Sequence, residues 1–355
     1  MRILYGVVGE GMGHATRSRV VIDHLVERGH DVRVVASGRA RDYLAGRAAP
    51  VGEIWGLTIA YTANEVRRWQ TLARNLQGAV SGWPRNVREY FRIAEEFAPD
   101  AVVSDFESFA WLFGRRHRLP VISVDNIQVI DRCRHDEAIT DGHQADFELA
   151  RALVRWKLPG CRHYVVTTFF RPPVRRARTT LVPSLLRPQI LEARPEEGEH
   201  LLVYQTAEGN EGLPLALAAS GLECRVYGYR RDIDHDAVEG RLTYRPFDEA
   251  AFVEDLRTAR AVLTGGGFTL LSECVQLGKP ALSVPLAGQF EQVLNGRYLE
   301  RLGYGMQVPS ATPEAIGAFA ERLPDHRAAL AGAERPGNGP ALAVLDELLA
   351  EAVPV

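Results

Sequence analysis

Short apolar runs alternate with longer amphipathic segments along the whole chain. In the first half, apolar runs bounded by Gly, Pro and Asp predict strands at residues 3–8, 32–36, 101–104, 121–124 and 164–168, the last strand of this half. Apolar residues at helical spacing predict helices at residues 17–27, 87–96 and 109–116. Strands separated by amphipathic helices are typical of a parallel sheet with crossover helices.

The second half repeats this alternation. Strands are predicted at residues 201–204, 224–227, 242–244, 261–263 and 281–284, with a terminal helix at 341–349. Because 355 residues are too many for one compact unit, we predict an α/β chain with two doubly wound, Rossmann-like domains facing across a cleft. The predicted units are an N-terminal domain at 1–178, a C-terminal domain at 179–338 and a C-terminal helix at 339–355.

Three consecutive glycines, Gly265 to Gly267, lie between the predicted strand 261–263 and a predicted helix at 268–277. The first N–H groups of a helix have no partner within the helix, and the helix dipole is positive there. Glycines let a phosphate approach these groups closely. Glu273, six residues after Gly267, could accept hydrogen bonds from a sugar diol. The turn therefore predicts a diphosphate site; the alternative is a tight turn before a capped helix.

A second glycine turn, Gly9-Glu10-Gly11-Met12-Gly13-His14, follows the first predicted strand. A dinucleotide fingerprint would require an acid after the second strand. That strand ends in Ser37-Gly38-Arg39 instead. An imidazole at a strand-to-helix turn is well placed for proton transfer, because it titrates near neutral pH. His14 is therefore a candidate general base; the alternative is that it only caps the helix.

Composition narrows the remaining classes of protein. The net charge of −3 argues against bulk nucleic-acid binding. No segment approaches the roughly 18 apolar residues that a membrane span needs. Met1 leads directly into a strand, without a signal-peptide core. The four cysteines are widely spaced, so we expect reduced thiols in a cytoplasmic protein, with neither a zinc site nor a disulfide framework.

The order of motifs in the second half resembles the donor domain of GT-B nucleotide-sugar glycosyltransferases. The resemblance is to the branch that contains the lipid II N-acetylglucosaminyltransferase and the small-molecule UDP-glycosyltransferases. It is carried by Gly265–Gly267, Ser272-Glu273, the run 278–285, Phe290-Glu291-Gln292 and Asn295. The N-terminal loop Gly9-x-Gly-x-Gly-His14 resembles the acceptor-side loop of this family, so the resemblance covers both halves.

This resemblance implies a role for each matched donor residue. Glu273 would bind the ribose hydroxyls, the glycine turn the diphosphate, and the pair Glu291 and Gln292 the donor sugar. The backbone near Phe247 would contact a uracil base. The complete implied donor set is Gly265, Gly266, Gly267, Thr269, Glu273, Phe247, Thr206, Asn210, Glu291, Gln292 and Asn295. Plant-type members carry a histidine where this chain has Gly265, so phosphate charge would be met by backbone N–H groups, hydroxyls or an arginine from elsewhere.

In the first half, the run 99–105 resembles the family's strand that ends in an aspartate beside the catalytic histidine. The resemblance implies that His14 is the general base and that Asp105 orients it; otherwise Asp105 is a turn residue or a helix N-cap. Glu10 is a competing base, and Asp125 is a second one. The implied acceptor contacts are Gly11, Gly13, Asp125 and Asn126.

The implied reaction is an inverting transfer from a nucleotide-diphosphate sugar, UDP-linked by resemblance. The acceptor would be a hydroxyl or amine of a small molecule, glycan or lipid. We expect no obligatory metal and no other cofactor, because no Asp-x-Asp motif, the usual metal ligand of the other glycosyltransferase fold, is evident. Two alternatives are a non-hydrolysing UDP-sugar 2-epimerase and a non-catalytic sugar-nucleotide sensor.

One segment is ambiguous. The run 64–76, continuing through Trp83 to Phe91, is basic with spaced aromatics. It is either an ordinary amphipathic helix or a cover for an apolar acceptor that also contacts an anionic membrane surface. Oligomeric state is left open.

Overall fold

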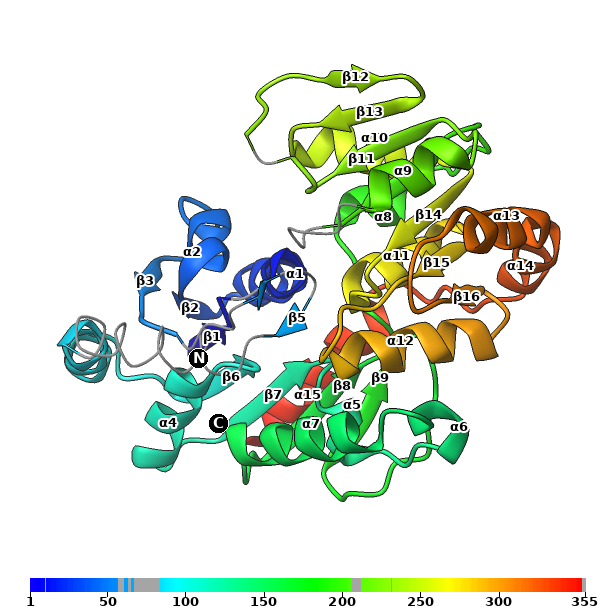
Figure 1. Cartoon of the computed structure of the whole chain (residues 1–355). Coiled ribbons are helices and arrows are strands. Elements are labelled where there is room, and N and C mark those ends of the chain that lie inside the picture. Colours follow the sequence, from blue (N-terminus) through cyan, green and yellow to red (C-terminus); the bar gives the residue numbers. More distant parts are fainter. Residues whose placement is uncertain are drawn as a thin grey trace.

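The computed structural model describes residues 1–9, 11–56, 84–205, 212–230 and 232–352, and the backbone alone at 61–62 and 65–66. In this part of the chain two seven-stranded sheets form two α/β lobes (Figure 1). A separate two-stranded ribbon pairs β4 (Tyr61–Thr62) with β5 (Glu65–Val66).

The first sheet has the strand order β3-β2-β1-β6-β7-β8-β9, and all its strands are parallel. The strands are β1 (Arg2–Val7), β2 (Asp31–Ala36), β3 (Val51–Glu53), β6 (Ala101–Asp105), β7 (Val121–Asp125), β8 (His163–Thr167) and β9 (Thr179–Val182). The helices are α1 (Met12–Glu27), α2 (Gly38–Leu44), residues 84–92, α4 (Ser108–Arg116), α5 (Val129–Arg132), α6 (Glu137–Thr140) and α7 (Gln144–Lys157). A π-helical turn, η1 (Ile93–Phe97), ends the helix 84–92.

The second sheet has the order β12-β13-β11-β10-β14-β15-β16, and among its described strands only β12 is antiparallel to its neighbour. Its strands are β10 (Leu201–Tyr204), β11 (Cys224–Tyr227), β12 (Ala237–Glu239), β13 (Leu242–Arg245), β14 (Ala261–Thr264), β15 (Ala281–Ser283) and β16 (Gly305–Gln307). Its helices are α8 (Pro188–Glu192), α9 (Gly212–Ala219), α10 (Glu249–Thr258), α11 (Phe268–Leu277), α12 (Phe290–Arg301), α13 (Pro313–Glu321) and α14 (Leu323–Ala331), and α15 (Gly339–Ala352) ends the chain's described part.

The predicted fold class is confirmed, with two exceptions in the detail of the first half. Residues 164–168 are not its last strand, because β9 pairs in parallel with β8 beyond the predicted boundary at residue 178. The predicted helix 87–96 begins at residue 84 and changes to a π-helix at Ile93. Strand β9 was missed because it does not alternate apolar and polar residues. Its four residues include two threonines, and only the last residue is buried.

Two late helices pack against the first sheet. Helix α15 contributes Ala341, Leu345 and Leu349 to the apolar cluster on one face. Helix α12 contributes four buried side chains to the cluster on the other face, namely Phe290, Val293, Leu294 and Tyr298. Figure 1 shows α12 above and α15 beneath the strands of this sheet. Because each such side chain contributes about 1.5–3 kcal/mol on burial, these helices hold the two lobes together.

The two glycine turns face each other across the cleft, as predicted. One follows β1 and leads into α1; the other follows β14 and leads into α11. A methyl group added at Gly13 would lie 2.5 Å from Oγ1 of Thr269, so the N-terminal ends of α1 and α11 are in close contact. The two lobes therefore meet at the N-termini of these two helices.

Candidate active site

The register of the first sheet places His14 beside Asp105. Strand β1 pairs with β6 so that Val7 lies opposite Asp105, and α1 then begins at Met12. His14 Nδ1 lies 2.7 Å from Oδ1 of Asp105, which is completely buried. Burial alone would raise the pKa of the Asp105 carboxyl, but Arg17 and then His14 hold it at about 2. Asp105 is thus an anion beside one ring nitrogen of His14, and when that nitrogen carries the proton, Nε2 has the lone pair that a base needs.

Two further residues of α1, which sequence reasoning missed, hold Asp105. Arg17 donates from Nη2 to Oδ1 at 2.6 Å and from Nε to Oδ2 at 3.1 Å. The Ser18 hydroxyl donates to Oδ2 at 2.8 Å. Both side chains are buried. The available signal was their position three and four residues after His14, which places all three on one side of the helix.

The competing bases are in different situations. Asp125 ends β7 and is completely buried. It accepts hydrogen bonds from the Ser123 hydroxyl at 2.6 Å and from the backbone N–H of Gln128 at 2.8 Å. Burial, and then the negative charge of Asp105, raise the pKa of Asp125 to about 6. Glu10 lies outside the described residues. Gly11 directly precedes α1.

A hydrogen bond across the cleft joins an expected acceptor contact to an expected donor contact. The Asn126 amide donates from Nδ2 to Oε1 of Glu291 at 2.7 Å. Asn295, one turn further along α12, donates to the carbonyl of Gly266 at 3.1 Å and lies 3.4 Å from the same Glu291 oxygen. The structure therefore brings Asn126, Glu291, Asn295 and the glycine turn into one connected group.

The glycine turn before α11 is shaped by close contacts. Gly266 has φ +87°, and a methyl group there would lie 2.6 Å from Oγ of Ser283 and 2.9 Å from the carbonyl of Gln292. Only glycine fits this position. Gly267 precedes α11, and no side chain of the described residues caps this helix. Gln292 accepts a hydrogen bond from the backbone of Leu286 at 2.9 Å, beside Gly265. The N–H groups at the start of α11 thus have no capping side chain among the described residues, and the anion site predicted there stays a prediction.

The expected ribose ligand, Glu273, has a partner that the sequence did not indicate. Both of its carboxylate oxygens accept from Arg187, at 2.7 and 2.8 Å, and only 1 % of Glu273 is exposed. Arg187 also lies 3.3 Å from Glu249, which accepts from the Tyr43 hydroxyl of the other lobe at 3.0 Å. A ribose bound here would therefore share Glu273 with Arg187. Phe247 is 52 % exposed near the end of β13; Thr206 and Asn210 lie outside the described residues.

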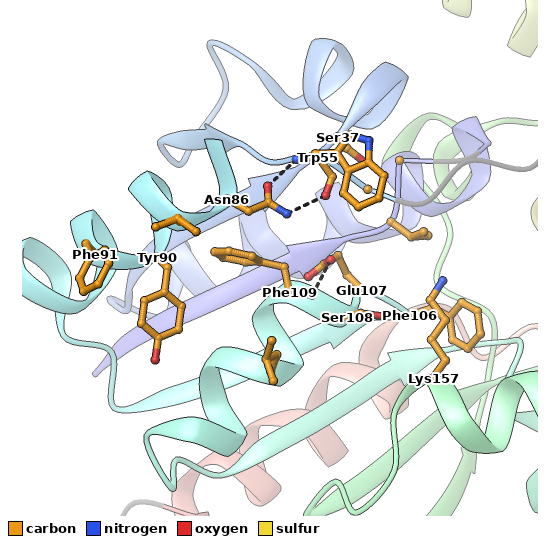
Figure 2. A pocket seen from close by; sticks show the side chains of 15 residues that line it. Ser37, Trp55, Asn86, Tyr90, Phe91, Phe106, Glu107, Ser108, Phe109 and Lys157 are labelled. Carbon is orange, nitrogen blue, oxygen red and sulfur yellow. Dashed lines mark hydrogen bonds between the residues drawn. The ribbon is translucent and has the colours of Figure 1, made fainter. Parts of the chain in front are cut away.

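A cavity of about 330 Å³ opens at the carboxyl ends of β1, β2, β3 and β6, next to the helix 84–92 and α4. Its walls are mainly aromatic and aliphatic, with Trp55, Tyr90, Phe91, Phe106, Phe109 and Leu112. Figure 2 shows the Phe106 ring beside Lys157, whose Nζ lies 4.1 Å from the ring centre. Phe106 follows Asp105 directly and has φ +52°, so the cavity begins one residue from the His14–Asp105 pair. Of its lining, the sequence analysis named Gly9 in the glycine turn, Ser37 after the second strand and the run that ends at Phe91.

The expectation that the sequence has no Asp-x-Asp motif is wrong. Asp232, Asp234 and Asp236 alternate in the loop before β12. The Asp234 side chain is 95 % exposed and lies 2.6 Å from His235. In the part of the chain that the structure describes, no group of three or more His, Cys, Asp or Glu side chains is arranged to hold a metal ion. None of the helices described is both long and apolar enough to span a membrane.

Two facing Rossmann-like lobes, each built on a seven-stranded sheet, are the GT-B fold that solved glycosyltransferases also have. A model of the glycosyl transferase family 1 matches residues 1–324, and the chain belongs to this family. It is therefore a transferase enzyme, and the epimerase and sensor alternatives are set aside.

Individual relatives agree with this assignment. The chain is 24 % identical to an uncharacterized glycosyltransferase of Methanosarcina mazei, over 89 % of its own length and 88 % of the relative's. It is 27 % identical to the UDP-N-acetylglucosamine--N-acetylmuramyl-(pentapeptide) pyrophosphoryl-undecaprenol N-acetylglucosamine transferase of Rhodospirillum rubrum, over 60 % of this chain and 66 % of that one. The solved glycotransferase of kitacinnamycin has the same fold, with a TM-score of 0.67, 18 % identity and 99 % of each chain covered.

Proposed function

We propose that the protein transfers a sugar, with inversion and without an obligatory metal, from a nucleotide-diphosphate sugar to an acceptor hydroxyl or amine. The observation that carries the proposal is the close approach of the two helix N-termini, which puts the His14–Asp105 pair opposite the glycine turn of α11. A UDP-linked donor is supported by the similarity to the Rhodospirillum rubrum enzyme, whose name specifies UDP-N-acetylglucosamine.

In the proposed reaction the acceptor oxygen or nitrogen attacks the anomeric carbon as its proton passes to Nε2 of His14. The bond between the anomeric carbon and the phosphate oxygen breaks, and the nucleoside diphosphate leaves with the electron pair. Asp105 stabilises the imidazolium that forms. The start of α11 faces the growing negative charge of the diphosphate, and this interaction strengthens in the transition state, which is what raises the rate. A single displacement of this kind inverts the anomeric centre.

We place the acceptor in the apolar cavity beside Phe106. Its volume of about 330 Å³ lies within the range of small-molecule sites. The aromatic lining favours an acceptor with an apolar body, held by ring contacts and by burial. Because Phe106 adjoins Asp105 and Gly9 lies in the loop that leads to His14, a hydroxyl or amine at the inner end of such an acceptor would face the base.

The test combines nucleotide binding with turnover. Calorimetry with UDP, dTDP, GDP and ADP should show selective binding of one nucleotide, and the matching sugar nucleotides should release that nucleotide on transfer to water or an added acceptor. His14→Ala should keep the nucleotide affinity and lower this release about 10²- to 10⁴-fold, the usual contribution of a general base. Absence of binding to every nucleotide contradicts the donor site. Normal turnover by His14→Ala assigns the base to Glu10 or Asp125.

A further inference from the structure

Arg17 occupies a position that the reaction described above does not use. Its side chain is 2 % exposed, yet its guanidinium bonds Asp105 twice and donates from Nη1 to the side-chain Oδ1 of Asn126 at 2.7 Å. The same Nη2 that bonds Asp105 lies 2.8 Å from Nδ1 of His14. A buried cation is stable only when its partners are this well placed. One side chain therefore contacts the base, its orienting carboxylate and the cleft.

The contacts continue without a break to the donor side. Asn126 is 3 % exposed and uses both ends of its amide: Oδ1 accepts from Arg17, and Nδ2 donates to Glu291 at 2.7 Å. A path of hydrogen bonds thus runs from His14 through Arg17 and Asn126 to Glu291, which belongs to the other lobe.

We infer that Arg17 is a positioning residue for His14, and that the path Arg17–Asn126–Glu291 couples the donor site to the base. This inference rests on the proposed function, in which His14 takes the acceptor proton and Glu291 contacts the donor sugar. A sugar hydroxyl that donates to Glu291 changes the hydrogen bond to Asn126, and through it the position of the guanidinium.

The tautomer of His14 explains why this position matters. Nδ1 is within hydrogen-bond distance of an acceptor, Oδ1 of Asp105, and of a donor, Nη2 of Arg17. When Nδ1 carries the proton and donates to Asp105, Nε2 has a lone pair and is a base. When Nδ1 accepts from Arg17, Nε2 carries the proton and cannot act. Asn126 holds Nη1 and thereby keeps the guanidinium on Asp105. The Asp105 carboxylate can only accept, so it favours the tautomer in which Nδ1 carries the proton.

Arg17 also divides the negative charge of Asp105 between two cations once His14 is protonated. Among the described residues, the other ionisable groups facing this cluster are Tyr5 from β1, Asp125 at the end of β7 and Glu291 from α12. Burial raises the pKa of the Tyr5 hydroxyl far above neutrality, so it stays uncharged. Burial raises the pKa of Asp125 to about 6. Replacing Arg17 by a neutral residue would leave Asp105 entirely to His14 and favour the imidazolium.

A double-mutant cycle with Arg17→Lys and Asn126→Ala tests the coupling. Lysine keeps the charge but cannot bond Asp105 and Asn126 together in the same geometry. The readout is kcat for nucleotide release from the sugar nucleotide, beside nucleotide affinity by calorimetry. We expect Asn126→Ala to lower kcat about tenfold in the natural sequence and less than about threefold in Arg17→Lys, because residues in one network are not additive. Equal losses in both backgrounds overturn the coupling.

The pH profile tests the positioning role independently. Arg17→Gln should move the acid limb of kcat/KM to higher pH, whereas Arg17→Lys should leave the limb in place with a lower plateau. If Arg17→Gln folds and the acid limb of its kcat/KM profile does not move, the positioning role of Arg17 is overturned. If Arg17→Gln does not fold, the double-mutant cycle with Arg17→Lys and Asn126→Ala tests the role of Arg17 instead. Arg132→Lys is the matched control, because Arg132 is a buried arginine that bonds Thr179 and Ala177 away from the cleft. Failure of the unaltered protein to bind any nucleotide would instead refute the proposed function.

Discussion

At the scale of the residue, two aspartates at the ends of neighbouring strands illustrate how environment sets chemistry. Asp105 and Asp125 are both completely buried. Burial raises the pKa of each, but Arg17 and His14 reverse the effect at Asp105 and hold its pKa at about 2. Asp125 has hydroxyl and backbone donors instead, and Asp105 repels its charge, so its pKa is raised to about 6. The first is a permanent anion, and the second is an acid that ionises near neutral pH.

Asp125→Asn should therefore stabilise the protein at pH 8 more than at pH 5. The folded-state pKa of Asp125 is raised from 3.8 to about 6. The stability that this carboxyl contributes is therefore complete at pH values below its pKa in the unfolded chain, and it is lost as pH rises through about 6. Linkage predicts that the gain on substitution is about 1–2 kcal/mol larger at pH 8. Urea unfolding at both pH values measures it, and equal gains would contradict it.

Asp105→Asn is the counterpart with the opposite sign. The pKa of Asp105 is lowered to about 2. The stability that this carboxylate contributes is therefore present at pH values above its pKa in the unfolded chain, and it is lost as pH falls through about 2. The substitution should destabilise the protein equally at pH 5 and pH 8.

The sequence allowed the pair His14 and Asp105 to be predicted, because each is marked by a motif next to a strand end. It did not reveal Arg17 or Arg187, since an arginine inside a helical or loop segment has the same pattern whether it faces solvent or a buried carboxylate. The side chains that complete the cavity, such as Trp55 and Phe109, come from separate strand and helix ends and meet only through the sheet order.

At the scale of the element, two adjacent glycines in the turn between β14 and α11 have different expected roles, one in stability and the other in binding. Gly266→Ala should destabilise the protein by about 1–3 kcal/mol, because the new methyl group meets Ser283 and a backbone carbonyl at positive φ. Gly267→Ala should leave stability within about 0.5 kcal/mol, because its φ is −61° and nothing lies within 4 Å of the added carbon.

Nucleotide affinity then distinguishes whether this turn binds a diphosphate or is only a tight turn before a helix. If a diphosphate approaches the start of α11, the methyl group of Gly267→Ala should weaken nucleotide binding although the fold is intact. Calorimetry on this variant measures the change, and unaltered affinity would mean that the turn serves only the fold. Elements of this kind were predictable, because apolar residues mark β14 and α11, and the three-residue strand β15 lies within the apolar run 281–284. The three-residue strands β3, β12 and β16 have no such run and are too short for any periodicity to show.

At the scale of the whole molecule, the last helix stabilises the first domain. Leu345 of α15 is 1 % exposed and packs in the apolar cluster of the first sheet, far from the strands of that sheet in sequence. The pattern predicted a helix at 341–349 but not its partner, because periodicity identifies an apolar face without identifying the surface that covers it.

Leu345→Ala should consequently unfold the first domain at lower denaturant concentration. Loss of a buried leucine typically costs about 2–5 kcal/mol. All five tryptophans lie between residues 55 and 156, so tryptophan fluorescence follows the first domain alone while circular dichroism follows the whole chain. A shifted midpoint by both probes shows that α15 and the first sheet unfold together. The control is Leu215→Ala, at a leucine that is 74 % exposed, which should change the midpoint little. A fluorescence transition unmoved by Leu345→Ala would mean that the N-terminal lobe is stable without the C-terminal helix.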